Sequence, residues 1–351
     1  MVLLDKVKSQ FGFSDGLSKF LHSYLIGREQ YVEVEGFRSS PFIPTSGVPQ
    51  GSNLGPLLFN MFINDLVESL TCQKLAYADD LKLFNRIDSY TDCINLQQNI
   101  NIVSTWCKNN KLSLNVAKCN ITSYHRIKNA ILYNYTIDDI SLKRSDSFKD
   151  LGIVFDEKFT FVPHIEQMIT SASRMLGFLI RNSKYFNNVT TVKLLYYSFI
   201  RSKFDYGSIV WSPIYACHIH FVENIQRRFL KYLVYMEDGI YPVRGVDQMQ
   251  LLSRFNELPL STRRQIQSIK FLYKLLHNAI DCPFLLNEVS FRVPRIGSRH
   301  RADFSLDLAR SNIVQQSPIY LMCSSFNTIS NICDIYYHNL GFIVNSFVST
   351  K

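Results

Sequence analysis

Residues 74–84 read Lys-Leu-Ala-Tyr-Ala-Asp-Asp-Leu-Lys-Leu-Phe, and this stretch decides the fold of the first part of the chain. Two short runs of alternating polar and apolar residues flank the acidic pair Asp79 and Asp80. Alternation on both sides of a short turn predicts a tight β-hairpin with the aspartates at the turn. Adjacent carboxylates repel one another, so placing them there is favourable only if a cation binds between them. The stretch therefore predicts a metal site.

An ordinary polar turn is the alternative reading, because Asp138 and Asp139 form a second acidic pair in this sequence. The loop before the hairpin adds information. Residues 45–59 read Thr-Ser-Gly-Val-Pro-Gln-Gly-Ser-Asn-Leu-Gly-Pro-Leu-Leu-Phe, after which leucine or phenylalanine recurs every four positions as far as Leu70. This spacing predicts an amphipathic helix with Pro56 in its first turn. Glycines ahead of a helix N-terminus let the backbone approach a ligand closely, and the free amides favour phosphate.

The remaining pattern divides the chain by secondary structure. Apolar spacing predicts two helices within residues 1–26 and a strand at 30–35, then a helix at about 91–110. Further strands are expected near residues 112–115, 121–124 and 151–155. From about residue 160 the spacing is helical almost throughout, which makes the chain α+β first and mostly α afterwards. Residues 311–351 carry only Asp334 and Lys351 as charges, and no structure is predicted for them.

Basic residues are concentrated in one region of the chain. The formal net charge is +9, and residues 159–310 hold 20 Lys and Arg against 11 Asp and Glu, whereas the rest holds 18 of each. A regional surplus suits a polyanion partner, because neutralised phosphates release counterions and give affinity that is independent of sequence. A solvated basic surface is the alternative.

The cysteines and the apolar runs point to a protein without membrane or disulfide chemistry. Eight cysteines are irregularly spaced with no Cys-x-x-Cys, so we expect them to be reduced. Residues 217–220 read Cys-His-Ile-His, but no second ligand pair follows at the spacing of a zinc finger. Charges interrupt the apolar residues at the N-terminus, and no run approaches the length of about 18 residues that spans a bilayer. We therefore expect an intracellular protein, in the cytoplasm or the nucleus, with no membrane partner.

Together, residues 46–59 and 77–80 resemble, in order and spacing, the reverse transcriptase of non-LTR retrotransposons, and most closely the jockey-like elements. The resemblance implies an α+β polymerase palm, an antiparallel sheet with packed helices, followed by a mostly α-helical thumb and C-terminal region. It implies an RNA-directed DNA polymerase that uses two-metal nucleotidyl transfer, with Mg²⁺, or Mn²⁺ in its place, at Asp79 and Asp80. The implied partners are an RNA template, a DNA primer and deoxynucleoside triphosphates; no protein partner is implied.

The same resemblance implies roles for further residues. Gln50, Gly51 and Tyr77 are expected to contact the nucleotide or the template. Residues 106–118 resemble the next palm motif, whose lysine, here Lys118, lies near the nucleotide phosphates and could serve as the acid for the leaving pyrophosphate. Residues 148–156 resemble the turn that grips the primer, with Lys149 and Asp150 where the family has an aromatic residue; its expected primer-grip residues are Phe148, Leu151 and Gly152.

The expected domains are a partial fingers and palm region at 1–158, a basic thumb-like helical region at 159–310 and a C-terminal segment at 311–351. An RNA–DNA hybrid would be held through its phosphates and groove shape rather than its sequence. Basic side chains of the thumb-like region are candidates for this contact: Arg174, Arg181, Lys184, Arg201, Lys203, Arg227, Arg228 and Lys231.

One element of the family pattern is missing from this sequence. A strand with the third metal-binding carboxylate precedes the helix in which this chain starts, and Asp5 lies in that helix rather than in the strand. We therefore expect an N-terminally truncated domain that cannot polymerise alone, since losing one carboxylate weakens metal binding and misplaces the reacting oxygens. The alternatives are a non-catalytic nucleic-acid-binding remnant or a chain that does not fold. A maturase uses the same palm, but the jockey-like motifs argue against it.

Overall fold

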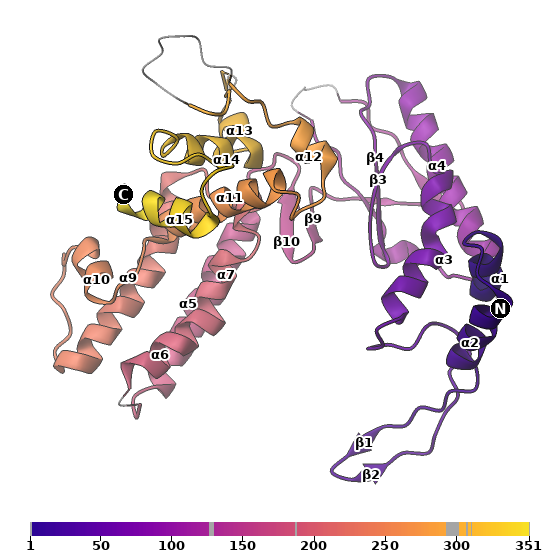
Figure 1. Cartoon of the computed structure of the whole chain (residues 1–351), viewed down its shortest axis with the longest axis horizontal. Helices are drawn as coiled ribbons and strands as arrows, with labels where there is room; N and C mark the ends of the chain where they lie inside the picture. Colours follow the sequence, from indigo (N-terminus) through magenta and orange to yellow (C-terminus); the bar gives the residue numbers. More distant parts are fainter. Residues whose placement is uncertain are drawn as a thin grey trace. The chain divides into compact units, whose positions relative to one another are not determined.

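The computed structural model describes residues 2–125, 130–186, 188–292, 302–306, 308–309 and 311–350. It is an α+β structure that divides into two compact units, Met1–Ser145 and Asp146–Lys351 (Figure 1). The division precedes the boundary at residue 158 expected from the sequence, so the hairpin with the expected primer-grip residues belongs to the second unit. Residues 187, 293–301, 307 and 310 of the expected thumb-like region lie outside the described residues.

Helices make up more of the first unit than strands do, and the sequence shows why several of them begin where they do. Ser14 accepts a hydrogen bond from the amide of Leu17, and Ser89 forms a capping box with Asp92. Pro56 occupies the first turn of its helix, as expected. The helical segments are α1 (Val2–Ser9), α2 (Asp15–Leu25), α3 (Gly55–Ser69), α4 (Tyr90–Asn109) and a 3-10 turn η1 (Val116–Lys118).

Strands in the described part of the chain pair only in twos. The pairs of the first unit are β1 (Glu33–Val34) with β2 (Phe37–Arg38), β3 (Gln73–Tyr77) with β4 (Asp80–Phe84), β5 (Asn120–Ile121) with β8 (Lys143–Arg144), and β6 (Thr136–Ile137) with β7 (Ile140–Ser141). The β5–β8 pair is parallel and the others are antiparallel. In place of one palm sheet, the described residues thus hold separate strand pairs, of which β3–β4 packs against the helices and β1–β2 is fully exposed.

Two apolar clusters hold the first unit together. One joins Val7 of α1, Leu21 of α2 and Leu58 of α3. The other joins Leu66 and Leu70 at the end of α3 with Val103 and Cys107 of α4, and the hairpin residues Leu81 and Leu83 pack against it. Figure 1 shows the β3–β4 hairpin lying beside α3 and α4. The expected helix periodicity is therefore confirmed, and it fixes one face of the acidic hairpin.

Long helices dominate the second unit, after one hairpin of β9 (Ser147–Asp150) and β10 (Ile153–Asp156). Asp156 ends this hairpin and begins the next helix, because its carboxylate accepts the amides of Thr160 and Phe161. The helices are α5 (Val162–Asn182), α6 (Val189–Tyr196), α7 (Ser202–Asp205), α8 (Ser208–Trp211), α9 (Ala216–Asp238), α10 (Gln248–Arg254), α11 (Leu260–Leu276), α12 (Pro283–Asn287), α13 (Asn312–Gln315), α14 (Pro318–Asn327) and α15 (Leu340–Ser349).

The second unit has two apolar cores. The larger one collects β10, α5, α6, α9 and α10 around the fully buried side chains of Trp211 and Leu230. The smaller one packs α14 and α15 against α11, so part of the segment at 311–351, for which no structure was predicted, forms helices with a buried face. A π-helical turn, η2 (Tyr197–Arg201), joins α6 to α7. Among the described residues, no helix combines the length and the apolar character needed to cross a bilayer.

Four strand predictions were wrong in detail. The strand expected at 30–35 is only Glu33–Val34, and of that expected at 121–124 only Ile121 lies in a strand. Residues 112–115 form no strand, because the chain goes from α4 through a left-handed Lys111 (φ +56°) into η1. The strand expected at 151–155 begins only at Ile153, since Leu151 and Gly152 have φ values of +43° and +87° and form the turn of the hairpin. Period-two spacing does not distinguish a strand residue from a turn residue beside it.

Candidate active site and nucleic-acid surface

The loop before α3 is held in shape by Ser52. Its hydroxyl donates to the carbonyl of Pro49 at 2.7 Å and accepts the amide of Gly55 at 3.0 Å. A Cβ atom on Gly55 would lie 2.8 Å from the Pro49 carbonyl oxygen, so the loop closes tightly only over glycine. Gln50 and Gly51 lie at the exposed tip, where Gly51 has a φ of +74° and open space around it. The hydrogen bonds of Ser52 thus fix the base of the loop, and the tip with Gln50 and Gly51 is exposed to solvent.

A partly buried ion pair fixes α3 beneath this loop. The Lys6 ammonium of α1 contacts both carboxylate oxygens of Asp65 at 2.8 Å and donates to the Phe62 carbonyl at 3.0 Å. The indole of Trp106 in α4 donates to the same carboxylate at 3.1 Å, and the ammonium lies 4.4 Å from the indole ring. Sequence reasoning missed Lys6, Asp65, Ser52 and Gly55. The sequence held one signal for this ion pair: Asp65 interrupts the apolar face of its helix, so its carboxylate needs a partner.

The acidic pair lies at the end of the β3–β4 hairpin, as predicted. Tyr77 pairs with Asp80 across the two strands, leaving Ala78 and Asp79 as the turn. Ala78 has a φ of +52°, a strained value for a residue with a side chain. Tyr77, Asp79 and Asp80 are all exposed, whereas Leu81 and Leu83 anchor β4 in the apolar cluster below. Both carboxylates therefore project to solvent from a hairpin whose base is packed.

These residues suit a hard divalent cation only in part. Two adjacent carboxylates supply the oxygen ligands that Mg²⁺ prefers, and exposure leaves room for water ligands. Within the described residues, however, no cluster of three or more Asp, Glu, His or Cys side chains could enclose a metal ion. Asp5 of α1 is exposed and is not part of any such cluster there. Asp79 and Asp80 can thus provide part of a metal site.

Lys118 lies on a separate element. It ends the 3-10 turn η1, where its amide donates to the Asn115 carbonyl at 3.0 Å and its side chain is exposed. Among the residues that the structure describes, the side chains of Gln50, Asp79, Asp80 and Lys118 form no hydrogen bond or ion pair with one another. The structure thus places Tyr77, Asp79 and Asp80 on one hairpin, Gln50 and Gly51 on one loop, and Lys118 on a third element.

In the second unit, the β9–β10 hairpin carries the expected primer-grip residues. Phe148 stacks on Phe155 with ring centroids 5.4 Å apart, and Phe155 meets Phe161 edge to face at 5.3 Å. Leu151 and Gly152 form the turn, where the Leu151 side chain is 46% exposed. The aromatic stack fixes the hairpin against the start of α5 and leaves its turn accessible.

Comparison with known proteins adds a family to this geometry. The profile of the family "Reverse transcriptase (RNA-dependent DNA polymerase)" matches residues 3–155, which include the loop, the acidic hairpin and most of the β9–β10 hairpin. Residues 3–155 belong to the reverse transcriptase family. The match therefore extends across the division between the two compact units and ends within β10.

Relatives of this reverse transcriptase domain are enzymes of non-LTR retrotransposons. The chain is 31% identical over 176 residues to the "RNA-directed DNA polymerase from mobile element jockey" of Drosophila funebris, covering 47% of this chain and 19% of the relative. It is 26% identical to the "Probable RNA-directed DNA polymerase from transposon BS" (64% and 26% covered) and 24% identical to that from "transposon X-element" (68% and 27% covered), both of Drosophila melanogaster. The chain spans about a fifth to a quarter of these relatives. No solved structure matches it.

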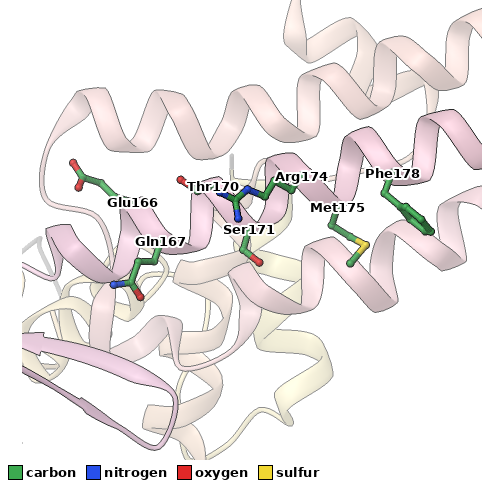
Figure 2. Close-up of a pocket in the computed structure, with 7 residues that line it drawn as sticks. All are labelled: Glu166, Gln167, Thr170, Ser171, Arg174, Met175 and Phe178. Carbon is green, nitrogen blue, oxygen red and sulfur yellow. The ribbon is translucent and has the colours of Figure 1, made fainter.

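A shallow groove follows one face of α5, directly after the reverse transcriptase match. It has a volume of about 670 Å³ and is lined by Glu166, Gln167, Thr170, Ser171, Arg174, Met175 and Phe178. Figure 2 shows the polar side chains along one stretch of the helix and Met175 and Phe178 at the other end. Lys203 of α7 donates to Ser171 at 3.1 Å, which adds a cation beside the groove. The groove is therefore open and largely apolar, with the cations Arg174 and Lys203 at or beside it and the carboxylate of Glu166 in its lining.

The eight basic candidates of the thumb-like region fall into two groups. Arg201 is paired with Glu257 and Asp205, Arg227 donates to the Val246 carbonyl at 2.6 Å, and Lys231 donates to that of Val243 at 3.3 Å. Lys203 is held by Ser171. The other four are exposed and make no hydrogen bond or ion pair within the described residues: Arg174, Arg181, Lys184 and Arg228. Three of these four lie on α5 or directly after it.

Proposed function

We propose that this chain supplies palm and thumb elements of an RNA-directed DNA polymerase that copies a primed RNA template with deoxynucleoside triphosphates. The observation that carries the proposal is the acidic pair of the reverse transcriptase match, exposed at the tip of a hairpin with a packed base. The names of the relatives, RNA-directed DNA polymerases of jockey and related elements, support the same chemistry.

In this proposal, Asp79 and Asp80 hold Mg²⁺, or Mn²⁺ in its place. When bound, such ions activate the primer hydroxyl and stabilise charge on the departing pyrophosphate. The nucleotide or template is contacted by Gln50, Gly51 and Tyr77. Lys118 lies near the nucleotide phosphates and acts as the acid for the leaving pyrophosphate. The exposure of all these side chains supports their availability to ligands.

The palm and thumb assignment rests on the order of the elements. Helices and separate strand pairs occupy the first unit, and α5 to α11 follow the match as the thumb-like helices. Phe148, Leu151 and Gly152 contact the primer strand. Arg174 and Arg181, seven residues apart on one face of α5, contact phosphates, because α-helical residues spaced by seven share a face. An intracellular setting, in the cytoplasm or the nucleus, fits the eight cysteines, which are all free.

Residues 1–351 alone are expected to bind a hybrid without extending it. Two carboxylates with no third ligating side chain nearby, within the described residues, hold catalytic cations weakly. The experiment incubates the purified chain and its Asp79→Ala variant with a primed RNA template, Mg²⁺ and all four deoxynucleotides. We expect hybrid binding and no extension by either protein. Extension that Asp79→Ala abolishes would show that the chain is a complete polymerase, and absence of hybrid binding would contradict the polymerase proposal itself.

The thumb assignment has its own test in salt-dependent binding. We expect Arg174→Gln with Arg181→Gln to weaken hybrid affinity about tenfold or more, and to lower the slope of log affinity against log salt by about 2, because two fewer phosphates are neutralised. Lys274→Gln removes a positive charge from α11 at an exposed position and is the control. Equal salt slopes for the double variant and the wild type would mean that α5 does not contact the phosphates.

A further inference from the structure

The turn of the β9–β10 hairpin is held by one residue far away in the sequence. The hydroxyl of Tyr206 donates to the Leu151 carbonyl at 2.6 Å. The Tyr206 ring also covers Gly152, since a Cβ atom there would lie 3.4 Å from its Cε1 atom. Leu151 and Gly152 both have positive φ, and a leucine rarely adopts this conformation without support. The turn is thus a strained backbone with a tyrosine side chain bound over it.

Gly207 brings the chain close enough for this contact. It has a φ of +60°, and a Cβ atom on it would lie 2.5 Å from the Cδ1 atom of Ile153, the first residue of β10. The positive φ favours glycine, and an added Cβ atom would push the end of the Ile153 side chain aside. The Trp211 indole donates to the Tyr206 carbonyl at 2.7 Å, which fixes Tyr206 from below because Trp211 is fully buried.

The base of this segment is fixed to a different helix. Asp205 precedes Tyr206 and accepts two hydrogen bonds from Arg263 of α11, at 2.8 Å and 3.3 Å. Arg201 lies 3.7 Å from the same carboxylate. A two-point contact of this kind restricts rotation as well as distance. Tyr206 therefore projects from a position that α8 and α11 both determine.

We propose that Tyr206 is a positioning residue that, with Gly207 beneath it, holds the Leu151–Gly152 turn in the conformation that contacts the primer terminus. The inference rests on the proposed function of the hairpin as the primer contact. A preformed turn contacts a strand without the loss of backbone freedom that a mobile turn would undergo on binding. The Leu151 side chain, 46% exposed, remains free to meet the primer while its carbonyl is occupied.

Tyr206 contributes more to the turn than to the core. Its side chain is 58% exposed, so Tyr206→Phe removes one hydroxyl from the surface and little buried apolar area. The substitution leaves the ring over Gly152 and removes only the hydrogen bond to Leu151. Tyr206→Phe thus tests the effect of this hydrogen bond on the turn with little change in the stability of the fold.

The experiment uses the full chain and an RNA template annealed to a DNA primer. Affinity for this hybrid is measured by titration, and the position of the primer terminus by its protection from a 3′ exonuclease. For Tyr206→Phe we expect nearly unchanged affinity and a loss of terminal protection on the order of fivefold, the size of one hydrogen bond. Tyr185→Phe is the matched control, because that tyrosine is 93% exposed in the same unit.

Three outcomes test this role. Equal terminal protection in Tyr206→Phe and wild type overturns the positioning role while leaving the proposed function intact. A parallel loss of affinity and protection also overturns it, because it indicates a general structural role. Failure of the wild-type chain to bind the hybrid overturns the proposed function and this inference with it. Gly207→Ala, if it folds, should lose at least as much protection as Tyr206→Phe.

Discussion

At the scale of single residues, the glycines and polar groups around α3 determine the shape of the candidate nucleotide loop. Gly55 is buried beneath Pro49 and Ser52, and the Ser52 hydroxyl connects the two sides of the loop. Gly16, by contrast, lies in the first turn of α2, where a Cβ atom would come no closer than 4.0 Å to the Ser14 hydroxyl oxygen. An added methyl group would therefore clash with the backbone at Gly55 and meet no close neighbour at Gly16.

Gly55→Ala is expected to lower the free energy of unfolding by about 1–3 kcal/mol, because the new Cβ forces the Pro49 carbonyl away. Gly16→Ala is the control and is expected to be neutral or to stabilise α2 by about 0.5–1 kcal/mol. Chemical denaturation of the purified variants measures both. A Gly55→Ala protein as stable as the wild type would mean that the loop adjusts without cost.

At the scale of elements, β10 is joined to α5 and α8 by His164. Its Nδ1 atom accepts the Val154 amide at 3.4 Å, and its ring meets Trp211 edge to face at 5.5 Å. Burial of the imidazole, with a smaller effect from Lys149, lowers the pKa of His164 below its ordinary value of 6.5. The folded hairpin thus favours a neutral ring.

This lowered pKa gives a pH dependence with a defined sign. The unfolded chain binds the proton more readily, so the contribution of His164 to stability is complete above pH 6.5 and decreases as the pH falls through 6.5 toward the folded pKa. We expect the free energy of unfolding to fall between about pH 7.5 and about pH 5.5 more steeply in the wild type than in His164→Asn. His220→Asn, at an exposed position on α9, should retain the wild-type slope. Identical slopes in all three proteins would exclude this role for His164.

Polar contacts also join the elements of the second unit around the π-helical turn η2. Glu257, between α10 and α11, accepts the Tyr197 hydroxyl and lies 3.4 Å from both Lys193 and Arg201. A π-helical turn is often found at functional positions. Here Tyr197 and Arg201 of this turn, together with Lys193 one turn earlier, contact the buried carboxylate of Glu257.

At the scale of the whole molecule, each compact unit has its own apolar core, and the reverse transcriptase match ends inside the second unit. Thermal unfolding of the full chain is therefore expected to show two transitions. Leu230→Ala, at a fully buried position of α9, should lower the free energy of unfolding of the second unit by about 2–5 kcal/mol. The transition that belongs to the first unit should stay unchanged. Gly55→Ala should affect only the first. Calorimetry of the two variants measures both transitions. A single cooperative transition that both variants shift would contradict independent unfolding of the two units.

The sequence by itself determined the family, the acidic hairpin and the helix after the loop, because a turn between alternating strands and an amphipathic face are local patterns. It also placed Gln50, Gly51, Tyr77, Asp79 and Asp80 on their elements. Tertiary structure alone decided which side chains hold these elements: Lys6 against Asp65, and Tyr206 over the Leu151 carbonyl. These pairs lie more than fifty residues apart. No local period encodes such pairs, since they arise only when separate helices and hairpins pack together.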